Sequence, residues 1–172
     1  EPTTNPTLTT KVRVAAYNVL FGIWAEPDSV GEMLKAYDLD LIGFSEVPDG
    51  NWTARVGQVL GMDHAYVGKI SSAHHKDKYK SILSRTPLLR THEIEIKGEG
   101  WSPASLVGAK TVIRGLPILA YSTHIPGRAL VEQSAAAFMA ESVIPQSIQT
   151  ANHVILLGDL NNRPGDAPLI RI

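Results

Sequence analysis

The sequence predicts an α/β fold, and three features of its 172 residues support that prediction. A strand–helix–strand pattern fills residues 12–46, and several strand-like stretches separated by turn residues fill 81–124. A long helical pattern at 130–148 then precedes a short apolar run, Val154–Leu157. Strands that alternate with helices are typical of sheets covered by helices. The length suits one domain with a sizeable core, which we expect to cover residues 11–172.

Composition narrows the function classes. Sixteen basic and seventeen acidic side chains give a formal net charge of -1, which argues against binding nucleic acid by bulk electrostatic attraction. The chain has no cysteine, so any metal must be held by oxygen or imidazole ligands. No apolar run approaches the roughly 18 residues that span a bilayer.

Residues 1–10 contain five threonines, two prolines and an asparagine, a composition that cannot pack a core. We expect a flexible leader, or the stub that remains after removal of a signal peptide. The stub favours a periplasmic or secreted location, and a cytoplasmic one stays open.

The first predicted unit is a strand at 12–18, a helix at about 28–37 and a second strand at 40–46. Two strands joined by a helix in this way are usually parallel neighbours. Asn18 and Glu46 would then emerge at the same edge of one sheet. Open sheets bind their ligands at that carboxyl edge.

The first helix begins with a capping pattern, in which Asp28 or Ser29 is the N-cap and Glu32 completes a capping box. A second helix is predicted over 49–60, and a loop rich in histidine and lysine over 74–80. Turn residues then separate further predicted strands, which cover 81–85, 88–96, 105–114 and 116–124.

The run Val154–Leu157 is typical of a strand buried on both faces. Gly158 lets the backbone leave this strand where a side chain would crowd the mouth of a site. Asp159 and Asn161 are two residues apart, so in an extended segment they point the same way and could together hold a proton and orient a ligand. The alternative is a strand end capped by an Asx turn.

Four predicted strands therefore end in polar groups: Asn18, Glu46, His124 and the pair Asp159/Asn161. Taken singly, each could be a turn former, a solvated carboxylate or an ordinary imidazole. Together they favour a site that binds a metal or transfers protons.

Short motifs around these residues follow one another in a recognisable order. They are Tyr17-Asn18, Phe44–Glu46, Ile82–Arg85 with Pro87, Ser122–His124 and Gly158–Asn161. This series resembles the motifs of the endonuclease/exonuclease/phosphatase superfamily, which includes deoxyribonucleases, abasic-site endonucleases, sphingomyelinases and inositol polyphosphate 5-phosphatases. The resemblance covers residues 12–164 and is specific for the superfamily, not for a substrate.

The resemblance implies a four-layer α/β sandwich, with two mixed β-sheets packed face to face and helices outside. It also implies a metal-dependent hydrolase of phosphodiesters or phosphomonoesters. Glu46 would bind Mg²⁺ or Mn²⁺ with Asn18 beside it, and His124 would contact the scissile phosphate. Asp159 would activate the attacking water, and Asn161 would orient that water or the phosphate. Magnesium accepts such hard oxygen ligands and keeps several waters.

The sequence departs from the superfamily in two ways. Leu20 stands where some relatives carry an aspartate, so the metal would depend more on Glu46. The superfamily also closes with a further aspartate motif and a Ser-Asp-His segment, neither of which occurs before Ile172. We interpret the sequence as lacking the C-terminal part of its domain, and as an inactive fragment by itself.

Substrate recognition is less specific. Asn18, Lys80 and Arg85 are candidate phosphate-binding residues, whereas a solvated loop explains Lys76 and Lys78 better. No pattern of interleaved aromatic residues marks a base-stacking surface. We therefore expect a monomer that acts on a small-molecule, sugar or lipid phosphate in preference to nucleic acid. A nuclease, or a non-catalytic binding domain or pseudoenzyme on the same fold, is the alternative.

Overall fold

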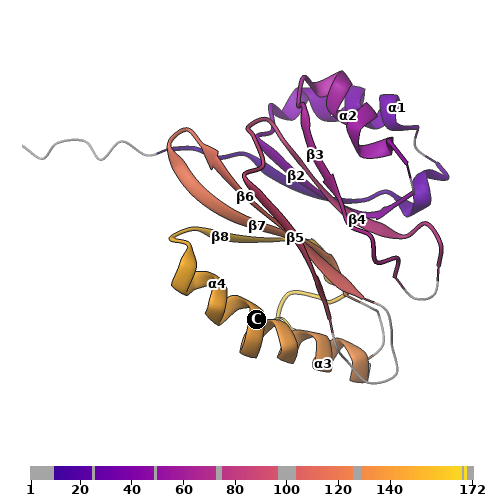
Figure 1. The fold of residues 1–172 in the computed structure, drawn as a ribbon. Coiled ribbons are helices and arrows are strands. Elements are labelled where there is room, and N and C mark those ends of the chain that lie inside the picture. Colours follow the sequence, from indigo (N-terminus) through magenta and orange to yellow (C-terminus); the bar gives the residue numbers. More distant parts are fainter. Residues whose placement is uncertain are drawn as a thin grey trace, which may run out of the picture.

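The computed structural model describes residues 10–24, 26–48, 50–72, 75–96, 104–125, 129–167 and 169, and residues 1–9 of the leader expected at 1–10 lie outside them. The chain forms four layers (Figure 1): two helices, a first sheet, a second sheet and a further helical layer. The predicted sandwich of two mixed sheets with helices outside is therefore confirmed.

Each sheet has four described strands and one parallel pair. The first, in the order β1-β2-β4-β3, consists of β1 (Val14–Asn18), β2 (Leu41–Val47), β4 (Tyr79–Ser84) and β3 (His64–Val67). The second, in the order β5-β6-β7-β8, consists of β5 (Arg90–Glu95), β6 (Ser105–Ile113), β7 (Leu116–His124) and β8 (Val154–Asp159). The expected parallel pairing of the first two strands is confirmed. Strand β3 was not predicted, because its four residues, His-Ala-Tyr-Val, are too few to show an alternating pattern.

The helices correct two details. The first layer holds α1 (Pro27–Leu34), continued by the 3₁₀ turn η2 (Lys35–Tyr37), and α2 (Trp52–Leu60). Pro27 takes the first helical position and Glu26 the N-cap, so the expected Asp28 or Ser29 cap is wrong. Proline suits that position because it has no N–H to satisfy. Glu32 forms an ion pair with Lys35 at 2.6 Å instead of completing a capping box.

The long helix expected at 130–148 is not uniform. It consists of α3 (Ala129–Phe138), the π-helical segment η3 (Met139–Val143) and α4 (Ile144–Thr150). Pro145 lies in the first turn of α4. Because proline donates no backbone hydrogen bond, the regular α ladder cannot run unchanged through this point.

Three apolar clusters separate the four layers. One, which includes Phe44 and Val56, packs α1 and α2 on the first sheet, and another, which includes Leu41 and Leu157, lies between the sheets. The third, which includes Tyr121 and Met139, packs the second sheet on the α3–α4 layer. Alternate residues of β2 thus face the helices and the other sheet, as the two-residue period of a strand requires.

The two sheets approach closely where β2 lies over β7 and β8. Gly43 makes this possible, since a Cβ there would lie 2.8 Å from the Cβ of Leu157. Ser122 also donates a hydrogen bond from Oγ to the carbonyl oxygen of Phe44 at 3.1 Å. This close contact holds the carboxyl ends of both parallel pairs near one another.

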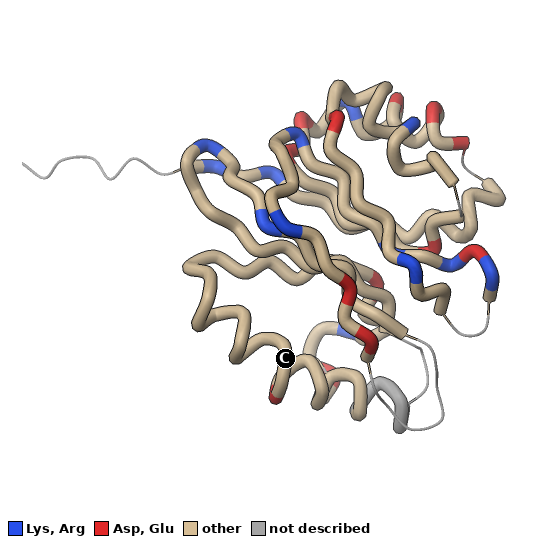
Figure 2. The backbone as a smooth tube through the Cα atoms, in the orientation of Figure 1, with Lys and Arg blue, Asp and Glu red and all other residues tan. Residues whose placement is uncertain are grey.

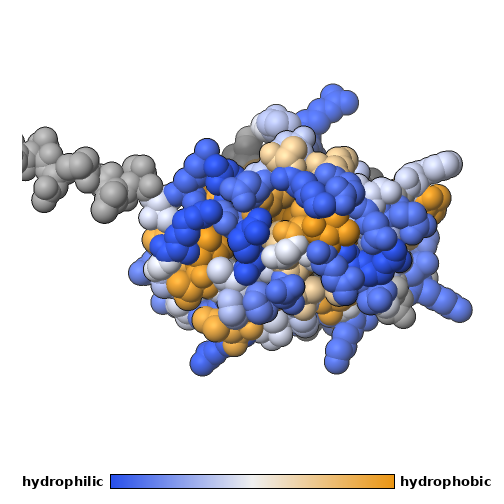
Figure 3. Space-filling view, turned by 90° about the horizontal axis from the view of Figure 1, so that it is seen from above, coloured by the Kyte–Doolittle hydropathy of each residue, from blue (hydrophilic) through white to orange (hydrophobic). Residues whose placement is uncertain are grey.

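The face seen in Figure 3 is mostly hydrophilic, with apolar areas between hydrophilic residues. Among the described residues, no helix is long and apolar enough to cross a membrane.

Asp40 joins three segments just before β2. Its Oδ2 accepts a hydrogen bond from the Arg13 backbone N–H at 2.8 Å and another from Arg114 Nη1 at 2.6 Å. Burial alone would raise the pKa of Asp40, but the hydrogen bonds from Arg114 and Arg13 outweigh it, so the pKa lies below its ordinary value of 3.8. The charged carboxylate is therefore the stabilising form.

We predict that Asp40→Asn lowers the free energy of unfolding at pH 7 by about 1–2 kcal/mol, because it removes charge from two hydrogen bonds near a partly exposed arginine. A depressed folded-state pKa stabilises the fold above the unfolded pKa, and this contribution is lost as the pH falls through the folded value. Urea unfolding at pH 7 and in steps below pH 3.8 should show the difference from wild type shrinking. A difference independent of pH would contradict this account.

Candidate active site

Residues from both sheets meet at the carboxyl ends of the parallel strands. In the first sheet Asn18 pairs with Ser45, next to Glu46, and in the second His124 pairs with Asp159. Since the two pairs are packed against each other, four chain segments that lie far apart in the sequence bring their last side chains together. The sequence prediction that Asn18 and Glu46 emerge at the same edge of one sheet is confirmed. His124 and Asp159 lie beside them from the second sheet.

Asn18 links the two sheets directly. Its Nδ2 donates to Asp159 Oδ2 at 3.0 Å and to Glu46 Oε1 at 3.2 Å. Its Oδ1 accepts a hydrogen bond from the Leu20 backbone N–H at 2.9 Å. The amide nitrogen of Asn18 thus faces the two carboxylates and positions them, while its oxygen accepts the Leu20 N–H and keeps a second lone pair.

Glu46 has an unusual backbone. It lies at a β-bulge between Ser45 and Val47 and has a positive φ of 57°, a conformation uncommon for a residue with a side chain. Its side chain is buried, and Oε1 forms an ion pair with Lys78 Nζ at 3.2 Å. Oε2 is also buried and has no hydrogen-bond partner within the described part of the chain. A buried, unpaired carboxylate oxygen is costly unless a cation or donor completes it.

His124 lies between the carboxylates. Its Nδ1 is 3.6 Å from Glu46 Oε1, and its Nε2 is 3.8 Å from Asp159 Oδ2. Burial lowers the pKa of His124 more than the charges of Glu46 and Asp159 raise it, so the imidazole is neutral at pH 7. Asn161 Nδ2 lies 3.0 Å from Nε2, and because an amide nitrogen can only donate, Nε2 accepts and the ring proton is on Nδ1.

The Gly158–Asn161 motif lies on the side of the site that belongs to the second sheet. Asn161 has a φ of 48° and lies after the end of β8, so the segment is not extended and strand alternation does not point Asp159 and Asn161 the same way. Its backbone N–H donates to Asp159 Oδ1 at 2.9 Å, which is the Asx turn. The same carboxylate also accepts a hydrogen bond from the Asn18 amide, so Asp159 forms the Asx turn and lies in the candidate site at the same time. Gly158 has a φ of 145°, and a Cβ there would collide with the carbonyl oxygen of Thr123. The glycine therefore allows β8 to lie close to β7 at this point.

The basic candidates have different positions. Lys80 is fully buried, and its Nζ donates to Ile70 O at 2.9 Å and to Ser72 Oγ at 2.8 Å. Burial lowers the pKa of Lys80 to about 8. Arg85 follows β4 at the opposite end of the sheet, since Ser84 pairs with Leu41, and it donates to the Leu39 carbonyl. The structure therefore brings neither Lys80 nor Arg85 into contact with the four strand ends.

Lys78 lies at the site, beside Glu46, although sequence reasoning favoured a solvated loop for it. It belongs to the lysine-rich loop before β4, which carries both signs of charge in Figure 2. Lysines in such loops are usually solvated. What brings Lys78 to the site is the antiparallel pairing of β4 with β2, in which Tyr79 lies opposite Val47, and that pairing has no local sequence signal.

Glu46 is the residue of this site that is best suited to hold a metal. No group of three or more His, Asp or Glu side chains among the described residues converges closely enough to hold a metal ion. However, Mg²⁺ keeps several waters and can be bound through one or two carboxylates. The unpaired Oε2 of Glu46 supplies such an oxygen.

Comparison with known proteins identifies the family of this chain. A sequence model of the endonuclease/exonuclease/phosphatase family matches residues 15–172. The chain belongs to this family. A search of curated proteins finds no match.

Solved structures of the family share the fold. An endonuclease/exonuclease/phosphatase from Beutenbergia cavernae is 20% identical with a TM-score of 0.74, and the match covers 92% of this chain and 49% of that one. A mannosyl-6-phosphatase from Bacteroides thetaiotaomicron is 15% identical with a TM-score of 0.74, and the match covers 94% of this chain and 69% of that one. Sphingomyelinase C from Streptomyces griseocarneus is 14% identical with a TM-score of 0.70, and the match covers 95% of this chain and 68% of that one. The chain thus spans about half the length of the Beutenbergia protein and about two thirds of the other two.

The ion pair between Lys78 and Glu46 can be tested by stability. We predict that Lys78→Met lowers the free energy of unfolding by about 2 kcal/mol, because it leaves a buried carboxylate without its counter-charge. Lys76→Met, two residues away and exposed, should change it by less than about 0.5 kcal/mol. Urea unfolding in metal-free buffer measures both variants, and equal effects would argue that Lys78 is a solvated loop residue.

Proposed function

We propose that this protein is a divalent-metal-dependent phosphoesterase, which hydrolyses a phosphodiester or phosphomonoester by in-line attack of an activated water. The observation that supports this most is the convergence of Asn18, Glu46, His124 and Asp159 from two sheets. A set of hard oxygen ligands, a fixed carboxylate and a neutral imidazole in one place suits phosphoryl chemistry.

Glu46 would hold the metal through its unpaired Oε2. When bound, Mg²⁺ or Mn²⁺ would neutralise charge on a phosphate oxygen during the displacement. Lys78 contributes a second positive charge beside Glu46. Because Lys78 and a metal would both be attracted to Glu46, we expect them to share its carboxylate or to compete for it.

Asp159 is the proposed general base. One of its oxygens accepts the Asn18 amide and the other the Asn161 backbone N–H, so its orientation is fixed. Its side chain is 32% exposed, which leaves a water access to it. A carboxylate within hydrogen-bond reach of the attacking water can take its proton as the phosphorus–oxygen bond forms.

His124 and Asn161 are the proposed phosphate ligands. The neutral His124 ring keeps a proton on Nδ1, and the amide of Asn161 fixes the ring through Nε2. Asn161 Nδ2 also donates to the carbonyl of Ile125 at 2.6 Å, which holds the amide in place. Asn161 Nδ2 can donate to a phosphate oxygen if it exchanges these hydrogen bonds when substrate binds, and His124 can do so once Nε2 takes up a proton.

For the substrate we propose a small-molecule, sugar or lipid phosphate over nucleic acid. The net charge of -1 gives no bulk attraction for a polyanion. Two similar structures carry names of this kind, a mannosyl-6-phosphatase and a sphingomyelinase C, although at identities of 15% and 14% they support the fold more than the substrate.

The metal assignment predicts a stability effect. With Mn²⁺ at about ten times its dissociation constant, binding should raise the free energy of unfolding of the wild type by about 1.4 kcal/mol. Glu46→Gln, which keeps the shape but not the charge, should abolish this gain, whereas Glu95→Gln, at an exposed glutamate of β5, should keep it. Thermal unfolding with and without Mn²⁺ measures the effect, and an unchanged gain in Glu46→Gln would refute the assignment.

The base assignment predicts a loss of turnover. In the full-length protein, Asp159→Asn keeps the volume but cannot accept a proton at neutral pH, so turnover of bis(p-nitrophenyl) phosphate with Mg²⁺ should fall about a hundredfold or more. If Asp159 were only a strand cap, the substitution should cost at most about 1 kcal/mol of stability and leave turnover intact. Measuring turnover and the thermal midpoint on one preparation separates the two roles.

A further inference from the structure

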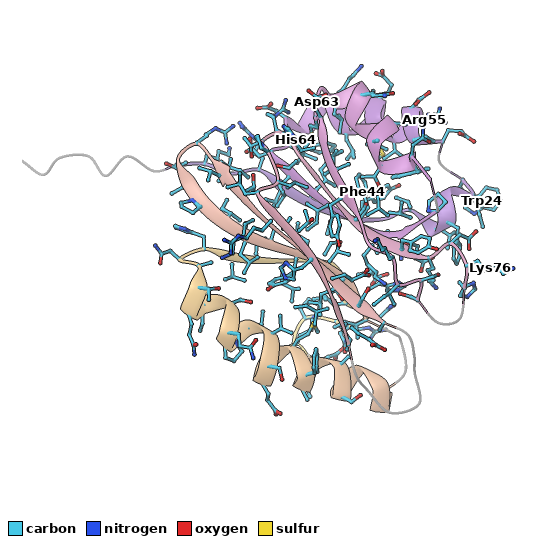
Figure 4. The ribbon with its side chains drawn as sticks, viewed as in Figure 1. Trp24, Phe44, Arg55, Asp63, His64 and Lys76 are labelled. Carbon is cyan, nitrogen blue, oxygen red and sulfur yellow. The ribbon has the colours of Figure 1, made fainter. Side chains whose placement is uncertain are left out.

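The segment that follows Asn18 exposes apolar side chains close to the site. Leu20, Ile23 and Trp24 are all exposed, and Trp24 is the most exposed large apolar residue described, at 84%. Figure 4 shows Trp24 and Lys76 at one end of the molecule, far from His64 and Asp63. We call Leu20, Phe21, Ile23 and Trp24 the apolar lip. Exposed apolar residues grouped in this way are typical of a binding surface.

The lip is held in a defined conformation. Leu20 and Phe21 have positive φ values of 45° and 60°, which are uncommon for residues with side chains. The Leu20 N–H donates to the Asn18 side chain at 2.9 Å, and the Gly22 N–H to the Val19 carbonyl at 2.9 Å. The lip is therefore tied to a residue of the candidate active site, and its strained backbone keeps apolar groups outside the core.

Phe21 connects the lip to the candidate active site through Lys78. Lys78 Nζ lies 5.1 Å from the centroid of the Phe21 ring, a cation–π distance, and 3.2 Å from Glu46 Oε1. The rings of Phe21 and His75 have centroids 5.3 Å apart at an angle of 42°. An aromatic pair thus lies one lysine side chain away from the carboxylate that would face the phosphate.

We propose that Phe21, His75 and Trp24 form a platform for the organic group of the substrate. A phosphate bound beside Glu46 would lie next to Lys78, whose Nζ is 5.1 Å from the Phe21 ring centroid, so its ester group would be within reach of the platform. This assignment rests on the proposed phosphoesterase function and narrows its substrate to esters whose organic group has an apolar or aromatic face. Small polar alcohols such as glycerol would gain nothing from it, since aromatic faces attract rings and hydrocarbon.

Binding of phosphate esters tests the platform without requiring turnover. Inorganic phosphate, glycerol 2-phosphate, phenyl phosphate and hexyl phosphate would be titrated into the protein by calorimetry, in the presence of Mg²⁺. We expect the wild type to bind phenyl or hexyl phosphate at least fivefold more tightly than glycerol 2-phosphate. A larger gain for phenyl phosphate would identify ring stacking, and a larger gain for hexyl phosphate would identify aliphatic contact.

Two lip variants and a matched control make the test specific. Trp24→Ala changes a side chain with almost no packing, and Phe21→Leu keeps an apolar contact with Lys78. Each should reduce the preference over glycerol 2-phosphate to about twofold or less, while affinity for inorganic phosphate changes less than twofold. Tyr37→Leu, at an exposed aromatic of η2 that follows α1, should leave the preference intact.

The outcomes separate this inference from the proposed function. Binding of inorganic phosphate with equal affinity for all three esters would overturn the platform and leave the phosphoesterase proposal standing. Loss of the preference in Tyr37→Leu as well would also overturn the platform, since the effect would not depend on the lip. No binding of any phosphate would contradict the site itself, and the platform with it.

Discussion

The contact on which the site depends is the amide of Asn18 between two carboxylates. Glu46 comes from the first sheet and Asp159 from the second, and two carboxylates that approach the same amide nitrogen repel each other through their like charges. The Asn18 amide donates one hydrogen to each, and the Lys78 ammonium adds a positive charge on the side of Glu46. The packing of the two sheets therefore determines where the carboxylates lie, and the hydrogen bonds from the amide offset the repulsion between them.

Backbone strain gathers around this contact. The described residues other than glycine with positive φ are Leu20, Phe21, Asp38, Glu46, Arg114 and Asn161. Four of these six lie in the site or on the apolar lip beside it. Such conformations cost free energy and persist only where the surrounding structure enforces them. The three apolar clusters of the sandwich supply that constraint, because they fix the strands from which Glu46 and Asn161 depart.

The sequence was sufficient for features that follow from local pattern. A strand–helix–strand unit is parallel for reasons of chain geometry, so the shared edge of Asn18 and Glu46 could be predicted. Short apolar runs likewise marked the strands before His124 and Asp159. The four-layer arrangement came from the family resemblance and not from periodicity. Lys78, strand β3 and the left-handed Asn161 could not be predicted, because each depends on pairing or on a turn between distant segments.

Lys78 couples the two parts of the site that the sequence left unconnected. Its ammonium contacts the carboxylate of Glu46 and the ring of Phe21 at the same time. A cation–π contact weakens when the cation moves off the ring, and a partly buried ion pair weakens when the cation finds another anion. A phosphate that attracts Lys78 must therefore change both contacts together. In the proposed phosphate site, the charge that would respond to the phosphate is the same one that contacts the aromatic ring, so binding of the organic group and of the phosphate would be linked.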